Sequence, residues 1–106
     1  MVLKGKTVIV SPQAEEDLKD LYEYLFTEFG KETLEKFHQK WLDFLKVVSC
    51  HPRLFPLLHK RKNLRKHAIH ERTMVVYKPT RTAIEIVTLF NTRQNPKSLK
   101  KVIRKY

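Results

Sequence analysis

Hydrophobic residues recur at helical spacing through residues 12–50, in two successive runs. The first run follows Ser11-Pro12, where Ser suits a helix cap and Pro suits the first helical position, and Gly30 predicts its end. The second run stops at His51-Pro52, because proline disfavours helix in the residue before it. So short a connection predicts an antiparallel helical hairpin. Its apolar positions are Ala14, Leu18, Leu21, Leu25 and Phe29, then Leu34, Phe37, Trp41, Phe44 or Leu45, and Val48.

Short runs rich in β-branched residues flank this hairpin and predict strands. One run precedes the helices and three follow them. Pro79-Thr80-Arg81 predicts a tight connection, so the last two strands are expected to pair as an antiparallel hairpin. The expected strands are Lys6–Val10, Leu64–His70, Thr73–Lys78 and Thr82–Phe90.

The order of these elements is β-α-α-β-β-β, which predicts an α+β fold with the two-helix hairpin packed on one face of a mostly antiparallel sheet. Asn91–Pro96 predicts a loop. Lys97–Tyr106 is compatible with a short, basic C-terminal helix whose apolar side carries Leu99, Val102, Ile103 and Tyr106. With 106 residues and no Gly- or Ser-rich linker, residues 1–106 are expected to form a single domain.

Composition places the chain among ordinary globular proteins, with 42% hydrophobic and 31% charged residues. No apolar run approaches the length of a membrane span, and the first ten residues lack the apolar core of a secretory signal. A single cysteine, Cys50, excludes an internal disulfide and fits a reducing cytosol. We therefore expect a cytoplasmic protein in which Cys50 packs as a small hydrophobic residue.

Charge changes this picture, because it is divided by position. Residues 51–106 carry 15 Lys and Arg against two acids, a net of 15 − 2 = +13, whereas residues 1–50 carry 7 against 9, a net of 7 − 9 = −2. The second half therefore produces the whole net charge of +11. Folding does not require such a bias, so it indicates partners: nucleic acid, an anionic membrane or an acidic protein.

The densest basic segment is His59–His67. Interleaved apolar residues tie it to the expected sheet, so it predicts a held surface that binds a polyanion through phosphate contacts. A solvated charge run is the alternative interpretation. The candidate RNA-binding residues are Lys60, Arg61, Lys62, Arg65 and Lys66.

Other chemistry finds little support in the residues. His67 and His70 lie three positions apart in an expected strand, which should place them on opposite faces of the sheet. No cysteine pair or carboxylate cluster completes a metal site, and Gly-rich phosphate loops and nucleophile elbows are absent from the sequence. We therefore expect no metal and no cofactor.

Three segments resemble the RelE/ParE toxin superfamily, in the expected order and over nearly the whole chain. The opening Val8–Leu18 contains Ser-Pro-x-Ala-x-x-Asp-Leu, His70–Tyr77 is similar to the third strand of the superfamily, and Ile84–Pro96 is similar to its last strand with an Arg-x-x-Pro tail. The resemblance implies the toxin of a bacterial type II toxin–antitoxin (plasmid stabilisation) module. It also implies an acidic cognate antitoxin as partner.

The superfamily divides by target, and the resemblance carries two activities with it. RelE-like toxins cleave mRNA on the ribosome without a metal, whereas ParE-like toxins inhibit DNA gyrase. We expect ribosome-dependent mRNA cleavage, with gyrase inhibition or an inactive, antitoxin-binding member as the alternatives. Cleavage needs cations for the phosphate and an acid/base pair. The catalytic candidates are Arg72, Arg93, His67, His70 and Tyr106.

Two departures from the RelE pattern bear on these candidates. The third strand has Met74-Val75-Val76-Tyr77 where RelE-like toxins have Arg-Leu-Val-Tyr, so Arg72 lies two residues early. The tyrosine that follows the last strand is missing, and only the terminal Tyr106 is available to replace it. Arg93, in contrast, matches the arginine after the last strand.

Overall fold

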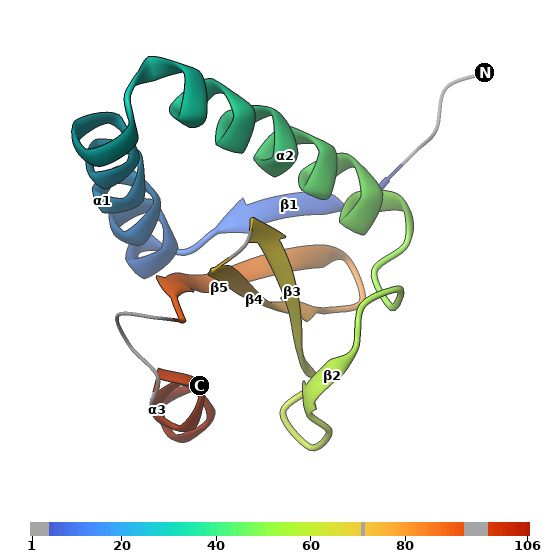
Figure 1. Ribbon diagram of the computed structural model, residues 1–106. Helices are drawn as coiled ribbons and strands as arrows, with labels where there is room; N and C mark the ends of the chain where they lie inside the picture. The colour runs from blue at the N-terminus through green and yellow to red at the C-terminus, as the bar shows by residue number, and fades with distance from the viewer. Residues whose placement is uncertain (1–4, 71, 93–97) are drawn as a thin grey trace.

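The computed structural model describes residues 5–70, 72–92 and 98–106, with the backbone alone for Ser98 and Leu99. In this part of the chain, five strands form one sheet, two long helices cover one face and a short helix lies against the other (Figure 1). The elements in chain order are β1 (Thr7–Val10), α1 (Pro12–Phe29), α2 (Lys31–Cys50), β2 (Leu57–His59), β3 (Leu64–His70), β4 (Thr73–Pro79), β5 (Ala83–Asn91) and α3 (Ser98–Lys105).

The sheet has the order β1-β5-β4-β3-β2. β1 runs parallel to β5, with Thr7 opposite Ala83, and the other neighbouring pairs are antiparallel. The predicted α+β fold and mostly antiparallel sheet are therefore confirmed.

One strand, β2, was not predicted. It spans three residues and pairs irregularly with β3, so its sequence shows no alternation to reveal it. The turn between β2 and β3 contains Asn63 in the left-handed region, with φ 53°, and its amide donates to the carbonyl of Lys60 at 3.1 Å. The basic segment His59–His67 is thus a β-hairpin whose tip carries Lys60, Arg61 and Lys62.

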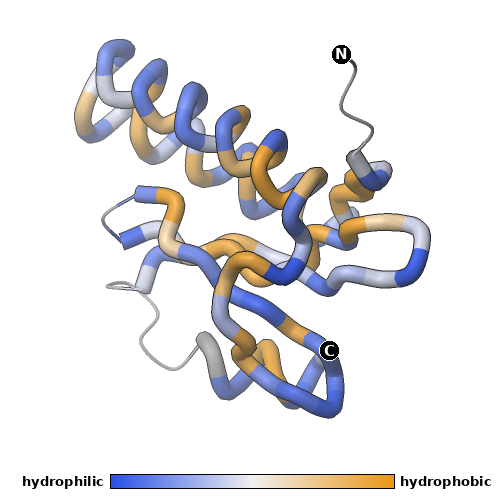
Figure 2. The backbone as a smooth tube through the Cα atoms, turned by 90° about the vertical axis from the view of Figure 1, so that its right-hand side faces the viewer, coloured by the Kyte–Doolittle hydropathy of each residue, from blue (hydrophilic) through white to orange (hydrophobic). Residues whose placement is uncertain are grey.

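The helical hairpin forms where the sequence predicts it. The hydroxyl of Ser11 accepts a hydrogen bond from the amide of Ala14 at 3.0 Å and caps α1. Gly30, with φ 88°, ends α1 and begins α2, which explains a glycine at this sharp connection. In the helical hairpin, hydrophobic and hydrophilic residues follow one another within each turn (Figure 2).

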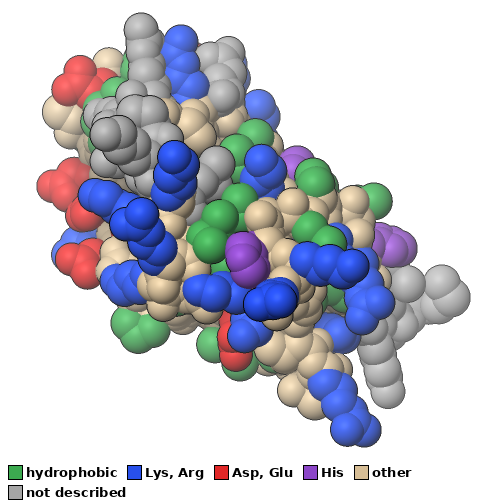
Figure 3. All heavy atoms as spheres, turned by 90° about the horizontal axis from the view of Figure 1, so that it is seen from below, with side chains coloured by type: hydrophobic (Ala, Val, Ile, Leu, Met, Phe, Trp, Pro, Cys, Tyr) green, Lys and Arg blue, Asp and Glu red, His purple; other side chains and the backbone are tan. Residues whose placement is uncertain are grey.

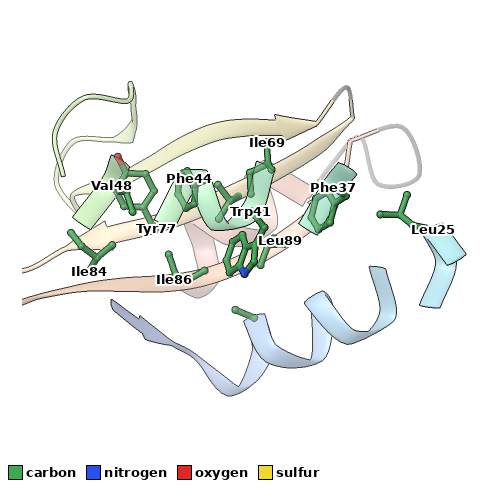
Figure 4. Packing of buried hydrophobic residues seen from close by; sticks show 12 residues of the cluster. Leu25, Phe37, Trp41, Phe44, Val48, Ile69, Tyr77, Ile84, Ile86 and Leu89 are labelled. Carbon is green, nitrogen blue, oxygen red and sulfur yellow. The ribbon is translucent and has the colours of Figure 1, made fainter. Parts of the chain in front are cut away.

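The main core lies between the helical hairpin and the sheet. Phe37, Trp41, Phe44 and Val48 of α2 are buried, as their spacing predicts, and point onto strand residues such as Ile86 (Figure 4). Burial of each large apolar side chain contributes about 1.5–3 kcal/mol. From the predicted stripe of α1, Ala14 and Leu25 are buried and Leu18 and Leu21 are half-buried, but Phe29 is 59% exposed at the end of the helix.

The short helix α3 covers the opposite face of the sheet. Its Val102 is buried against Leu64, Val76 and Val87, and Tyr106 packs at the margin of this second cluster. Helices therefore lie on both faces, whereas the sequence predicted a helical layer on one.

Candidate functional site

Arg72 lies in the turn between β3 and β4, where the end of β5 reaches it. Its carbonyl accepts hydrogen bonds from the amide of Thr92 at 2.7 Å and from the hydroxyl of Thr92 at 3.2 Å. The Arg72 side chain is exposed, and His70 is half-buried just before the turn. The fold therefore brings Arg72, His70 and Thr92 to one end of the sheet. Arg93, the other arginine candidate, lies outside the described residues.

His67 packs against two phenylalanines on the helical side of the sheet. Its ring centroid is 5.6 Å from that of Phe44, with an interplanar angle of 7°, and 3.9 Å from that of Phe55. Burial lowers the pKa of His67 below its usual value, because the charged form loses solvation. A cavity of about 210 Å³ opens beside this stack. It is lined by Lys40, Asp43, Phe44, Val47, Phe55, His67 and Ile69.

His70 also contacts α2, since its ring lies edge-on to that of Phe37 with 6.5 Å between centroids. The prediction that His67 and His70 occupy opposite faces is therefore wrong. The register between β3 and β4 shifts between Ala68 and His70, and such an irregularity breaks simple alternation. Within 5–70, 72–92 and 98–106, no group of three or more His, Cys, Asp or Glu side chains is arranged to hold a metal ion.

Tyr106 occupies a different place from the other candidates. It packs in the cluster between α3 and the sheet, and the ammonium of Lys105 lies 5.4 Å from its ring centroid. Lys62 in the β2–β3 turn donates to the carbonyl of Ile103, so the C-terminal end of α3 lies at the end of β3 away from Arg72. Because β3 spans roughly 20 Å at about 3.3 Å per residue, this distance separates the C-terminal end of α3 from the turn that holds Arg72.

The predicted RNA-binding residues divide into two groups. Lys60 and Arg61 are exposed at the hairpin tip, and Lys62 donates from its ammonium to the carbonyl of Ile103 in α3. Lys66 lies opposite Val76 on the face that α3 covers. Arg65 instead donates through Nη1 to the carbonyls of Arg53 at 3.2 Å and Phe55 at 2.7 Å, so its guanidinium holds segment 52–56 against β3.

Two further residues matter that the sequence did not single out for these roles. Tyr77, which matches the tyrosine of the third-strand motif, is fully buried and donates from its hydroxyl to the carbonyl of Pro52 at 2.9 Å. Burial raises its pKa, and the nearby charge of Arg65 opposes part of that rise. Asp17, read in the sequence as a residue that suits the helix dipole, accepts hydrogen bonds from the hydroxyl of Thr88 and the amide of Leu89.

A groove of about 350 Å³ lies next to Asp17, between α1 and the end of β5. Its walls combine carboxylates of α1 with apolar side chains of both elements. The lining residues are Asp17, Asp20, Leu21, Tyr24, Leu89, Phe90 and Asn91.

Charge is divided by face as well as by sequence. The nine acids of the first half all lie in α1 and α2, on one side of the sheet. Seen from the other side, the surface is crowded with Lys and Arg side chains (Figure 3).

Cys50 is exposed at the end of α2, so the prediction that it packs as a small hydrophobic residue is wrong. Among the helices that the structure describes, none has the length and apolar character needed to span a bilayer.

Comparisons with known proteins extend these observations. The family model described as the ParE toxin of the type II toxin–antitoxin system parDE matches residues 8–96. Comparison with curated protein sequences finds no significant match.

Solved structures from toxin–antitoxin systems have the same fold. The chromosomal ParDE system from P. aeruginosa matches with a TM-score of 0.67 at 13% identity, over 83% of this chain and 97% of that chain. The E. coli DinJ-YafQ complex matches with a TM-score of 0.59 at 12% identity, over 85% of this chain and 96% of that chain. The YoeB-YefM complex from Staphylococcus aureus matches with a TM-score of 0.53 at 20% identity, over 79% of this chain and 93% of that chain. At these identities the likeness establishes the fold alone.

Proposed function

Because the chain belongs to the family of ParE toxins of type II toxin–antitoxin systems, we propose that it inhibits DNA gyrase by binding it and does not cut RNA. This choice reverses the order of preference drawn from the sequence, where mRNA cleavage came first. The reversal rests on the positions of the described candidates for catalysis.

The observation that carries the proposal is the separation of these candidates. Ribonuclease chemistry needs an acid, a base and phosphate-binding cations around one phosphate, within hydrogen-bond reach of the reacting atoms. Arg72 and His70 lie at one end of β3, His67 is stacked against Phe44 and Phe55, and Tyr106 packs on the other face. The lowered pKa of His67 also favours a neutral ring near pH 7, which suits packing. Such an arrangement supports a toxin that acts by binding.

The proposed partner that silences the toxin is an acidic antitoxin. The similar structures from P. aeruginosa, E. coli and S. aureus are described as toxin–antitoxin systems or complexes. A net charge of +11 favours a partner of opposite sign, because complementary charge speeds encounter and suppresses wrong partners.

Metal-independent, ribosome-dependent mRNA cleavage is the second candidate function. The observation that favours it is the meeting of Arg72, His70 and Thr92 at one end of the sheet. An exposed arginine beside a histidine offers a phosphate ligand and a side chain that can act as a general acid or base.

Two assays with the purified protein separate these functions. Negative supercoiling of a relaxed plasmid by gyrase should fall with added protein, while translation of a reporter mRNA in a gyrase-independent extract should continue. Cleavage of the reporter mRNA with undisturbed supercoiling would replace the proposal by the ribonuclease. If the protein reduces neither supercoiling nor translation but still binds its antitoxin, it is an inactive member that only binds its antitoxin.

A further inference from the structure

The face of the sheet that carries α3 forms a continuous basic surface built from three elements. The exposed side of α3 contributes Lys100, Lys101, Arg104 and Lys105. This helix is held against the sheet by Val102, so its cations have a defined position. Figure 3 shows the concentration of Lys and Arg side chains on this side of the molecule.

The β2–β3 hairpin extends this surface. Lys62 reaches the carbonyl of Ile103, which brings the hairpin tip, with exposed Lys60 and Arg61, next to the C-terminal end of α3. The charges at the tip and on the helix therefore belong to one surface, although about forty residues separate them in the sequence.

The strands complete the basic face. Lys66 lies opposite Val76, whose side chain packs in the cluster under α3, and Lys78 follows Val76 by two residues and so projects to the same side. Glu85, opposite Lys78, is the one acid that the described residues beyond position 50 contribute. The net charge of this face is therefore strongly positive, and we call it the basic face.

Among the described residues, the basic face exposes one large hydrophobic side chain, Ile9, at the edge of the sheet. Among the described residues, the large hydrophobic side chains that are exposed are Ile9, Phe26, Phe29, Leu42, Val47, Leu54 and Leu57. Four of them belong to α1 or α2, and Leu54 precedes β2. Leu57 of β2 lies opposite Arg65 and so faces the helical side of the sheet. Ile9 lies opposite Glu85 on the face that carries α3, but in the edge strand β1, away from the hairpin. A protein partner requires buried apolar or aromatic anchors at the centre of its interface. A phosphate backbone requires cations instead, and draws its affinity from counterion release.

The burial of its aromatic side chains argues against a single strand as ligand. Single-stranded nucleic acids are held by bases stacked on exposed aromatic rings, whereas Phe90 and Tyr106, which pack in the cluster on this face, are half-buried. We propose that the basic face binds the phosphate backbone of double-stranded DNA, without reading its sequence. The choice of DNA rests on the proposed function, since duplex DNA is what gyrase acts on.

Binding to a labelled 20-base-pair DNA duplex of mixed sequence, measured by fluorescence anisotropy without gyrase, tests this proposal. The variant Lys100→Glu/Lys101→Glu reverses two charges in the first turn of α3, where acids suit the helix dipole and should not unfold the helix. Lys60→Glu/Arg61→Glu does the same at the hairpin tip. Each pair should weaken binding about tenfold or more and lower the salt slope by about two.

The matched control is Lys19→Glu/Lys46→Glu, which changes the net charge equally through exposed positions of α1 and α2. It should alter the affinity by about twofold or less, because its charges lie on the other side of the sheet. Circular dichroism should show that all three variants are folded. An equal loss of affinity in the control and the two test pairs would overturn the proposal.

Competition experiments identify the class of ligand. The unlabelled DNA duplex should displace the labelled one more effectively than poly-glutamate, a single-stranded oligonucleotide or an RNA duplex of equal charge. Stronger displacement by poly-glutamate would assign the basic face to an acidic protein, and stronger displacement by either of the others would assign it to another nucleic acid. If the protein binds the duplex but does not inhibit gyrase in the supercoiling assay, the proposed function is contradicted, whereas the proposal of DNA binding is retained.

Discussion

Asp17 in α1 accepts a hydrogen bond from the amide of Leu89 in β5, with 3.2 Å between Oδ2 and N. β1 pairs with β5 from Ala83 to Ile86, and among the described strands none pairs with this edge of β5 beyond that point. The carboxylate occupies this edge and also accepts from the hydroxyl of Thr88. Asp17 thus accepts hydrogen bonds from β5 where β1 no longer pairs with it. This contact holds α1 against β5 beside the groove that Asp17 lines.

We expect Asp17→Ala to destabilise the fold by about 1–3 kcal/mol, because the amide of Leu89 and the hydroxyl of Thr88 would lose their acceptor in a half-buried setting. Urea unfolding followed by circular dichroism measures this loss. Asp20→Ala, at an exposed position of the same helix, is the control and should change stability by about 0.5 kcal/mol or less. Equal effects of the two substitutions would show that the Asp17 contacts contribute nothing.

Arg65 should act as a structural residue and not as a ligand for phosphate. Arg65→Ala removes both hydrogen bonds to segment 52–56, so we expect a loss of about 1–3 kcal/mol and faster proteolysis within that segment. The control Arg61→Ala, at the exposed hairpin tip, should preserve stability and weaken polyanion binding instead. A stable Arg65→Ala protein with weakened nucleic-acid binding would contradict this assignment.

His67 should make stability depend on pH. Burial lowers its pKa in the folded state, so the unfolded chain binds more protons below the usual value of 6.5. The contribution of the neutral His67 ring to the free energy of unfolding is therefore complete above that value. It decreases as the pH falls from about 6.5 toward the pKa of His67 in the folded state. His67→Phe keeps a ring against Phe44 and Phe55, and should reduce the loss of stability in that window. Urea midpoints measured between pH 7.5 and 5 would refute the prediction if the two proteins declined in parallel.

Substitution of Arg72 and Arg93 distinguishes gyrase inhibition from mRNA cleavage. If the protein inhibits gyrase by binding, the double variant Arg72→Ala/Arg93→Ala should still arrest bacterial growth, since no phosphoryl transition state needs these guanidinium groups. In a ribonuclease, loss of a preorganised donor costs about a hundredfold in cleavage rate, and Arg93→Lys restores only part of it. Single-turnover cleavage of mRNA in the ribosomal A site measures that rate, with circular dichroism as the control for folding. A folded double variant that has lost both growth arrest and cleavage would establish the catalytic role.

Local patterns were sufficient for most of the elements. The spacing of apolar residues predicted α1 and α2 and identified Phe37, Trp41 and Val48 as core residues, because one face of each helix must exclude water. Ser11 and Gly30 set helix ends through interactions within a few residues, which a sequence displays directly. The runs that form β3, β4 and β5 were recognisable for the same reason.

The candidate site was less accessible to the sequence, because its residues meet through pairings between distant segments. Nothing local shows that Asp17 meets Leu89, that Arg65 holds segment 52–56, or that Lys62 reaches α3. The short strand β2 and the shift that turns His70 toward Phe37 depend on register with neighbouring strands. The need for glycine at position 5 also depends on a distant segment, because a Cβ there would lie 1.9 Å from the hydroxyl oxygen of Ser49 in α2.

Sequence alone determined the helical hairpin, the strands that follow it and the division of charge between the two halves, because composition and periodicity are properties of the chain itself. The tertiary structure decided that α3 covers the face opposite α1 and α2, and so converted a division along the chain into a division between two faces. That conversion required long-range packing of Val102 against Leu64, Val76 and Val87, whose energy depends on which surfaces meet. Spacing along the chain does not encode such a meeting.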